Sequence, residues 1–234
     1  MIRFAPVLIA IGYGLVLYFF SAWRTRRELD ERSTVLADPA LQRTLDRLAN
    51  ALEIDRIRVH IYEIEPVNGL AAPDGRIFLT RGFYRKYREG SVSDEELAGV
   101  VAHELGHVAL GHSRRRMIDF SGQNALRAAL VLMMPPFLRF VGIYIANFLV
   151  ALVAARLSRG AEYEADAYAA ALLTKAGIGT DPQKTLFRKL GRLTGTGANG
   201  VPAWLLSHPK IEERIAAIET LERRWKPGTR DLDA

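Results

Sequence analysis

His103-Glu104-Leu105-Gly106-His107 has the form H-E-x-x-H, and the rest of the chain is organised around it. On a helix, two histidines four residues apart place their rings on the same face. Two neutral imidazoles in that arrangement bind one Zn²⁺ ion, and Glu104 can accept a proton from a water on the metal. The stretch therefore predicts half of a catalytic metal site.

The residues before this motif predict that it lies on a helix. Ser93 to Glu96 forms a capping box, which marks the start of a helix. Apolar residues then recur at helical spacing: Leu97, Val100, Val101, Leu105 and Val108. An isolated H-E-x-x-H match has only three fixed residues and also occurs by chance, so its place within a helix is what favours the metal interpretation.

A catalytic zinc site needs a third protein ligand. The metzincin pattern would place glycine three residues and histidine six residues after His107. Those positions hold Leu110 and Ser113, while Gly111 and His112 are each displaced by one residue. The sequence therefore excludes the metzincin class, and we expect His112 to be a helix-end or supporting residue rather than a ligand.

A later acidic segment, residues 158–166, offers a glutamate as the third ligand. Glu162 and Asp166 are four residues apart on one helical face, whereas Glu164 points about 200° away from Glu162. Glu162 can bind the metal while Asp166 accepts the far N–H of a ligand histidine and fixes its tautomer. The alternative is an ordinary acidic helix start, since carboxylates suit an N-terminal turn. The upstream motif favours the ligand.

Together these motifs resemble the HtpX-like membrane zinc metallopeptidases, a gluzincin family that includes the CAAX prenyl endopeptidases. The resemblance extends over Asp38 to Leu221 and is carried by H-E-x-x-H, by Ser158-Arg159-x-x-Glu162-x-x-Ala165-Asp166 and by Ser207-His208-Pro209. It implies the following zinc ligands: His103, His107 and Glu162. It also implies that Glu104 is the catalytic base. His208 would face the zinc, either stabilising the oxyanion or binding the metal as a reversible inhibitory ligand.

Two strands are expected before the metal helix. Residues 56–64 alternate between apolar and polar, and residues 76–80 follow a turn-rich link. The two strands either form a simple hairpin, or one is a sheet edge to which an extended peptide adds. The resemblance implies that the substrate cleft is bordered by Asn68, Ile77, Phe78, Leu79 and Thr80. The family usually has Asn-Ala where this chain has Asn68-Gly69.

Phe4 to Trp23 carries no charge and has the ~20 residues that a helix needs to span a bilayer core. A cleaved signal peptide is the alternative, but only Arg3 precedes the stretch and no clean cleavage site follows it. Four arginines follow the stretch: Arg24, Arg26, Arg27 and Arg32. The positive-inside rule then predicts a single-pass inner-membrane protein with its anchor in residues 1–27 and its catalytic domain in the cytoplasm.

A second apolar stretch, residues 125–157, interrupts the expected metallopeptidase domain of residues 28–226. The two halves of one metal site flank this insert, so the chain must return to the side of the membrane that it left. Two full crossings need about 40 residues plus a turn, more than the insert provides. We expect a helical hairpin turning at Pro135-Pro136 that either enters the near leaflet or packs over the catalytic domain. Residues 227–234 are expected to form a polar tail.

Composition narrows the class of protein. The 234 residues are 49% hydrophobic and 25% charged, include no cysteine, and carry a net charge of +6. The lack of cysteine excludes disulfides, thiolate zinc sites and thiol proteases. A basic chain suits nucleic acid or an anionic membrane. Because no nucleic-acid motif is present and the arginines cluster beside apolar stretches, membrane lipid is the favoured partner.

We expect an α+β, mainly helical, zincin-type fold with a small hairpin or sheet edge beside the metal helix. The expected function is a membrane-anchored zinc endopeptidase that cleaves protein or peptide substrates. The resemblance implies misfolded or membrane proteins as substrates, hence a role in quality control. The alternative is a non-proteolytic membrane chaperone or scaffold that retains a structural zinc site. The sequence leaves the natural substrate, the cleavage preference and the oligomeric state open.

Overall fold

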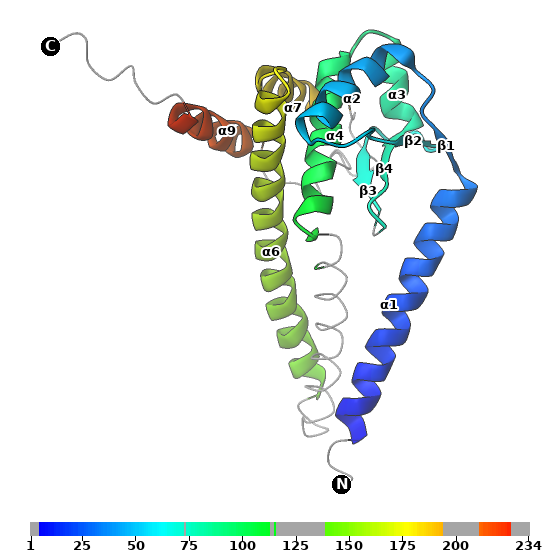
Figure 1. The fold of residues 1–234 in the computed structure, drawn as a ribbon. Coiled ribbons are helices and arrows are strands. Elements are labelled where there is room, and N and C mark those ends of the chain that lie inside the picture. The colour runs from blue at the N-terminus through cyan, green and yellow to red at the C-terminus, as the bar shows by residue number, and fades with distance from the viewer. Residues whose placement is uncertain (1–4, 73, 113–114, 116–138, 194–210, 226–234) are drawn as a thin grey trace, which may run out of the picture. The chain divides into compact units, whose positions relative to one another are not determined.

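A computed structural model describes residues 5–72, 74–112, 115, 139–193 and 211–225. The chain forms two compact units, one of Met1–Glu31 with Gly111–Gly160, the other of Arg32–Leu110 with Ala161–Ala234. The second unit contains the sheet and the H-E-x-x-H helix (Figure 1). Mainly helical and carrying a small mixed sheet, the described chain confirms the α+β prediction.

The first unit contains helix α1 (Ala5–Glu31) and the beginning of helix α6 (Arg139–Lys175). Large apolar side chains of α1 are exposed: Tyr13, Leu15, Val16, Phe19, Phe20 and Trp23. Within the described ranges, no helix combines the length and the apolar character that crossing a membrane requires. The anchor in residues 1–27 stays a prediction. The expected turn at Pro135-Pro136 and the polar tail lie outside the described residues.

Four short strands form one sheet in the order β1-β2-β4-β3. Their bounds are β1 (Ser33–Val35), β2 (Val59–Tyr62), β3 (Gly69–Ala71) and β4 (Ile77–Thr80). β2 and β4 run parallel, whereas β1 and β3 are antiparallel to their neighbours. The hairpin interpretation of residues 56–64 and 76–80 is therefore wrong. Parallel neighbours need a longer connection than a tight turn, and part of that connection is β3.

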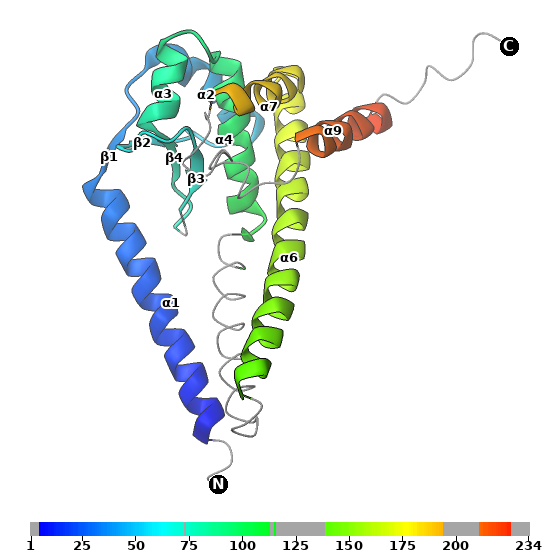
Figure 2. The ribbon, with the colours of Figure 1, turned by 180° about the vertical axis from the view of Figure 1, so that it is seen from behind.

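This topology changes which strand can accept a peptide. β4 is paired on both sides, and all four of its residues are buried. The possibility that residues 76–80 form the sheet edge is therefore wrong, because the backbone groups of β4 already pair within the sheet. That Ile77, Phe78, Leu79 and Thr80 border the substrate cleft stays a prediction. β3 is the edge strand at this end of the sheet, and it packs against helix α4 (Figure 2).

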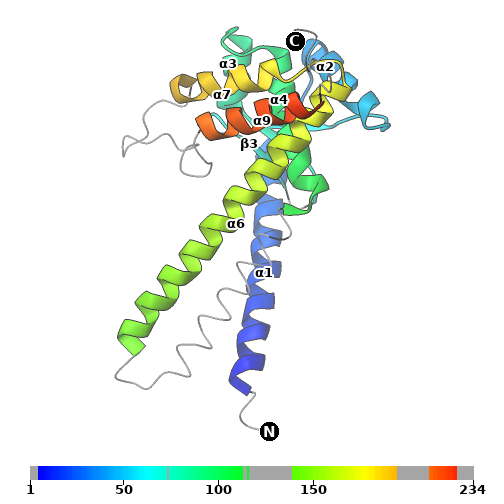
Figure 3. The same ribbon diagram turned by 90° about the vertical axis from the view of Figure 1, so that its left-hand side faces the viewer.

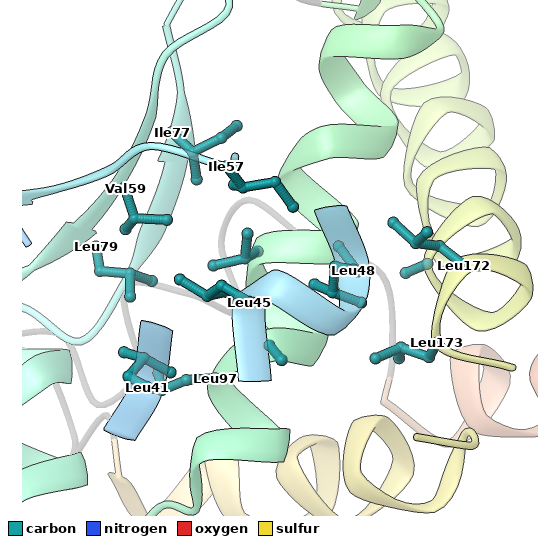
Figure 4. Packing of buried hydrophobic residues seen from close by; sticks show 14 of the residues in the cluster. Leu41, Leu45, Leu48, Ile57, Val59, Ile77, Leu79, Leu97, Leu172 and Leu173 are labelled. Atoms are coloured by element: carbon teal, nitrogen blue, oxygen red, sulfur yellow. The ribbon is translucent and has the colours of Figure 1, made fainter. Parts of the chain in front are cut away.

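Helix α2 (Pro39–Ala51) begins at Asp38-Pro39, because aspartate is a preferred N-cap residue and proline suits the first helical position. The Asp38 carboxylate accepts hydrogen bonds from the N–H groups of Ala40 and Leu41 at 3.0 and 3.1 Å, which caps the helix. The Tyr84 hydroxyl donates to the same carboxylate at 2.9 Å. The leucines of α2 form the core with residues of the sheet, α4 and α6, as Figure 4 shows for Leu41, Leu45, Leu48, Leu97 and Leu173.

Helix α4 (Asp94–Ala109) carries the metal motif and begins with the predicted capping box. Ser93 Oγ accepts from the Glu96 N–H at 3.1 Å, and the Ser93 N–H donates to the Glu96 carboxylate at 2.9 Å. Helix α3 (Arg81–Arg88) precedes it, and α7 (Asp181–Leu193) and α9 (Ile211–Trp225) follow. Helix α7 packs against both α4 and α9, and Figure 3 shows α7 and α9 side by side.

Candidate metal centre

The two histidines of the motif lie on one face of α4, well inside the helix. His103 and His107 are both buried, and their Nε2 atoms are 3.1 Å apart. The helical spacing of four residues brings the two rings together, and the packing of α4 removes them from water. Both histidines thus present a nitrogen to the same small volume.

Glu162 reaches this volume from α6, because α4 and α6 approach each other closely at Gly106. A Cβ added to Gly106 would lie 3.1 Å from both the Cα and the carbonyl oxygen of Ala165. Glycine at this position therefore allows the short distance between the helices. Glu162 lies deep within the 37 residues of α6, so the alternative of an acidic helix start is wrong.

The three side chains are spaced as the ligands of a single metal ion would be. His103 Nε2 is 3.4 Å from one oxygen of Glu162, and His107 Nε2 is 3.5 Å from the other. Two ligands bound at about 2.0–2.1 Å to a tetrahedral ion lie about 3.3–3.4 Å from each other. Among the described residues, these three form the group able to hold a metal ion.

Asp166 supports His103 from the side opposite the metal volume. His103 Nδ1 lies 2.9 Å from Asp166 Oδ1. An ionised carboxylate only accepts hydrogen bonds, so Nδ1 carries the proton and Nε2 is left to face a metal. The structure thus brings Asp166 to the place that its spacing from Glu162 predicts.

Arg214, on α9, is a member of the site that the sequence analysis missed. It is 1% exposed, and its Nε and Nη2 donate to the two oxygens of Asp166, both at 2.6 Å. Its guanidinium lies 4.1 Å from the centroid of the Phe187 ring. The sequence carried one sign that Arg214 is buried: it lies on the apolar face of α9 together with Ile211 and Ile218. A lone cation on such a face needs a buried anion.

The electrostatics of this cluster follow from its burial. Burial lowers the pKa of His103, but hydrogen bonds with Asp166 and Glu162 raise it to about 9. Burial raises the pKa of Asp166, yet Arg214 and His103 together hold it below its usual value. Asp166 therefore stays an anion, and a metal ion that binds His103 must displace a proton from the ring.

Glu104 occupies the same helix face and lies next to the edge strand. It is buried, and its Oε1 is 3.4 Å from the position that a Cβ on Gly69 would take. Thr80 holds the start of β3, since its hydroxyl donates to the Asn68 carbonyl at 3.0 Å and accepts from the Asn68 N–H at 3.0 Å. The role of Thr80 is thus to fix Asn68. His208 lies outside the described residues.

A helix with H-E-x-x-H, completed by a glutamate from a later helix, defines a metallopeptidase fold. Residues 36–222 match the model described as peptidase family M48, and the chain belongs to this family. The match falls within the predicted catalytic region and, with the HtpX homologues among the relatives, confirms the HtpX-like resemblance.

Three relatives illustrate the range of the similarity. Metalloprotease LoiP of Escherichia coli K12 is 30% identical over 172 residues, which cover 71% of this chain and 66% of LoiP. A protease HtpX homologue of Bordetella pertussis is 29% identical over 212 residues, which cover 75% of this chain and 68% of the homologue. A putative beta-barrel assembly-enhancing protease of Vibrio cholerae is 28% identical over 215 residues, which cover 86% of this chain and 43% of that protease. The chain thus spans just under two thirds of LoiP.

Proposed function

We propose that the protein is a zinc-dependent endopeptidase. One observation carries the proposal: the side chains of His103, His107 and Glu162 converge on one small volume. Glu104 lies on α4, the helix that carries both histidines. Two imidazoles and one carboxylate are the donor set of catalytic zinc sites that keep a fourth position open. His103, His107 and Glu162 would hold the ion. When bound, zinc supplies Lewis acidity, polarising a peptide carbonyl and making water acidic near pH ~7.

Glu104 acts as the general base and then as the general acid. Its carboxylate takes a proton from the water whose oxygen attacks the peptide carbonyl carbon. The C–N bond then breaks, and Glu104 delivers that proton to the leaving nitrogen. The buried Asp166–Arg214 pair keeps the His103 ring oriented throughout. His208 enters this proposal only through the family resemblance, as a group facing the zinc.

The substrate binds as an added strand on β3. A sheet edge offers unpaired backbone N–H and C=O groups, and an extended peptide can use them. Gly69 brings this edge close to Glu104, so that a peptide lying along β3 passes the catalytic carboxylate. Backbone pairing recognises an extended conformation rather than a particular sequence, which suits unfolded protein substrates.

The cellular setting that we propose is the membrane. The uncharged stretch from Phe4 to Trp23 and the exposed apolar side chains of α1 support an anchor in residues 1–27. The arginines that follow favour a cytoplasmic peptidase domain in residues 28–226. Quality control of misfolded or membrane proteins is the role that fits this placement. A reporter fused to the C-terminus is expected to score as cytoplasmic, and a periplasmic signal would overturn this orientation.

The decisive experiment compares Glu104→Gln with Glu95→Gln, a partly exposed glutamate on the same helix. We expect Glu104→Gln to retain about one zinc per chain and to cleave an unfolded protein ~10²–10⁴-fold more slowly than wild type. Glu95→Gln is expected to match wild type in both measurements. Equal turnover by all three proteins would refute the mechanism and favour the non-proteolytic alternative.

A further inference from the structure

The dipeptide Asn68-Gly69 lies where the edge strand β3 begins, beside the candidate metal centre. Asn68 is half-buried, and like Glu104 it lines a pocket that is partly open to solvent. Asparagine is a thermolabile residue, because the main-chain nitrogen of the next residue can attack its carboxamide. Glycine carries no Cβ to hinder that attack. The two residues therefore form a pair that can react in water without any further partner.

We propose that Asn68 is a deamidation site whose reaction inactivates the substrate-binding edge, and that Thr80 restrains this reaction. The Gly69 nitrogen attacks Cγ of Asn68 and forms a new C–N bond. The side-chain nitrogen then leaves as ammonia, taking the proton that the Gly69 N–H gives up. Water opens the resulting succinimide ring at either of its two carbonyl groups. The product is aspartate or isoaspartate, and in isoaspartate the main chain runs through the former side chain.

The pairing of β3 places the attacking nitrogen on the open side of the sheet. In an antiparallel pair, successive residues turn alternately toward the partner strand and away from it. The Asn68 carbonyl accepts a hydrogen bond from the Thr80 N–H at 3.0 Å, so Asn68 turns toward β4. Gly69 is the next residue and turns away. Its N–H thus faces the free edge of the strand.

Thr80 holds the peptide groups on both sides of the Asn68 Cα. Its buried hydroxyl accepts from the Asn68 N–H and donates to the Asn68 carbonyl, both at 3.0 Å. Before the Gly69 nitrogen can reach Cγ, the bond between Cα and the carbonyl carbon of Asn68 must rotate, which turns this carbonyl away from Thr80. The reaction therefore proceeds only while this end of β3 is open, and its rate follows the open fraction.

Either product would impair the edge on which the proposed substrate binding depends, so this consequence rests on the proposed function. Aspartate adds a negative charge to the pocket that Glu104 already lines. Isoaspartate adds one carbon to the main chain at the start of β3, which shifts the residues that follow out of register with β4. Neither change touches a metal ligand. We expect the modified protein to keep its zinc affinity and to cleave peptides more slowly.

The test follows deamidation by peptide mass spectrometry while the full chain is incubated in mildly alkaline buffer. Asn199-Gly200 serves as the internal reference, because it is the same dipeptide and is unchanged in every variant. Thr80→Val removes the hydroxyl but keeps the size of the side chain. Each lost hydrogen bond shifts the opening equilibrium by roughly 2–10-fold, so the loss of two predicts conversion of Asn68 that is roughly 5–100-fold faster.

Two control variants separate this effect from general damage to the fold. Thr80→Ser keeps the hydroxyl and is expected to deamidate at the wild-type rate. Thr44→Val removes another buried hydroxyl, which donates to Asp94 on a different helix, and is also expected to match wild type. The native wild type gives a test without any variant, since Asn68 should convert more slowly there than in urea, where β3 is unpaired.

The rates at Asn68 decide the proposal. Equal rates in native and urea-unfolded wild type, or in wild type and Thr80→Val, would overturn the role of Thr80. If Asn68 stays intact in Thr80→Val while Asn199 converts, the modification site itself is overturned.

A final measurement concerns inactivation. In an Asn199→Gln background, Asn68-Gly69 is the remaining Asn-Gly pair, and ion exchange separates the deamidated protein from the intact one. The two fractions are compared for zinc affinity and for cleavage of an unfolded protein. Equal cleavage rates would overturn inactivation. If the intact fraction cleaves nothing, the endopeptidase proposal fails and inactivation fails with it, whereas the masses alone still decide the modification site.

Discussion

Replacing Arg214 with methionine, alone and together with a change at Asp166, tests two roles of this buried pair: stabilising the fold and supporting metal binding. The substitution removes both hydrogen bonds of 2.6 Å to Asp166 and leaves a buried carboxylate whose remaining partner in the cluster is His103. Removing one partner of a buried ion pair typically costs about 3–5 kcal/mol. We expect a loss of that size in the free energy of unfolding.

The double variant Arg214→Met with Asp166→Leu should recover most of this stability. It leaves no unpaired charge, and replacing a buried ion pair with apolar residues is often neutral or even stabilising. Metal affinity should not recover, because His103 Nδ1 then lacks the acceptor that orients its ring. Loss of such a supporting hydrogen bond typically lowers metal affinity ~10–100-fold.

Two measurements test this separation. Urea unfolding of the chelator-treated protein gives stability, and competition with a zinc-binding dye gives affinity. Lys184→Met is the control, because Lys184 pairs with Glu222 of α9 at 2.8 Å, away from the metal centre. Since Glu222 is one-quarter exposed and keeps contact with water, the control is expected to cost less stability than Arg214→Met and to leave zinc affinity unchanged. If the double variant binds zinc as tightly as wild type, Asp166 does not orient His103.

Three further perturbations test other parts of the structure. A Cβ on Gly69 would lie 2.6 Å from Val100 Cγ1, so Gly69→Ala should displace β3 and slow peptide cleavage. Adding Val100→Ala should restore the cleavage rate. Wild-type activity in the single variant would contradict this. Gly106→Ala should push α6 away from α4 and weaken zinc binding in a dye competition, with unchanged affinity as the contrary result. Burial raises the pKa of Asp38, but hydrogen bonds from a backbone N–H and from Tyr84 hold it below its ordinary value of 3.8. Its charge therefore stabilises the fold above pH 3.8, and this contribution is lost as the pH falls through the lower folded pKa. The urea midpoints of wild type and Asp38→Asn should differ at pH 6 and converge toward pH 2, and a constant difference would refute this.

The sequence predicted the parts of the structure whose signals are local. Asp38-Pro39 and the Ser93–Glu96 capping box both mark helix starts within four residues, and both helices begin there. Strand pairing has no such signal, because residues 56–64 alternate in the same way whether their partner is parallel or antiparallel. The short edge strand β3 was therefore interpreted as a turn-rich link.

The site shows the same division between local and distant information. Helical spacing relates His103 to His107 and Glu162 to Asp166 without any knowledge of the fold. The partner of Arg214, by contrast, lies 48 residues earlier in the chain, and no spacing rule connects two different helices at that distance. The close helix contact at Gly106 is hidden for the same reason, since a glycine within a helix does not reveal what packs against it.

The order in which these residues are synthesised has a consequence for when the enzyme can act. His103 precedes Asp166 by 63 residues and Arg214 by 111. At a translation rate of ~5–20 residues per second, the last of the three is made roughly 6–22 s after the first. A nascent chain or a prematurely terminated product that lacks α9 would thus hold the H-E-x-x-H helix without the arginine that completes its support. Full support of the metal ligand His103 would therefore be reached only once α9 has been synthesised and packed against Asp166.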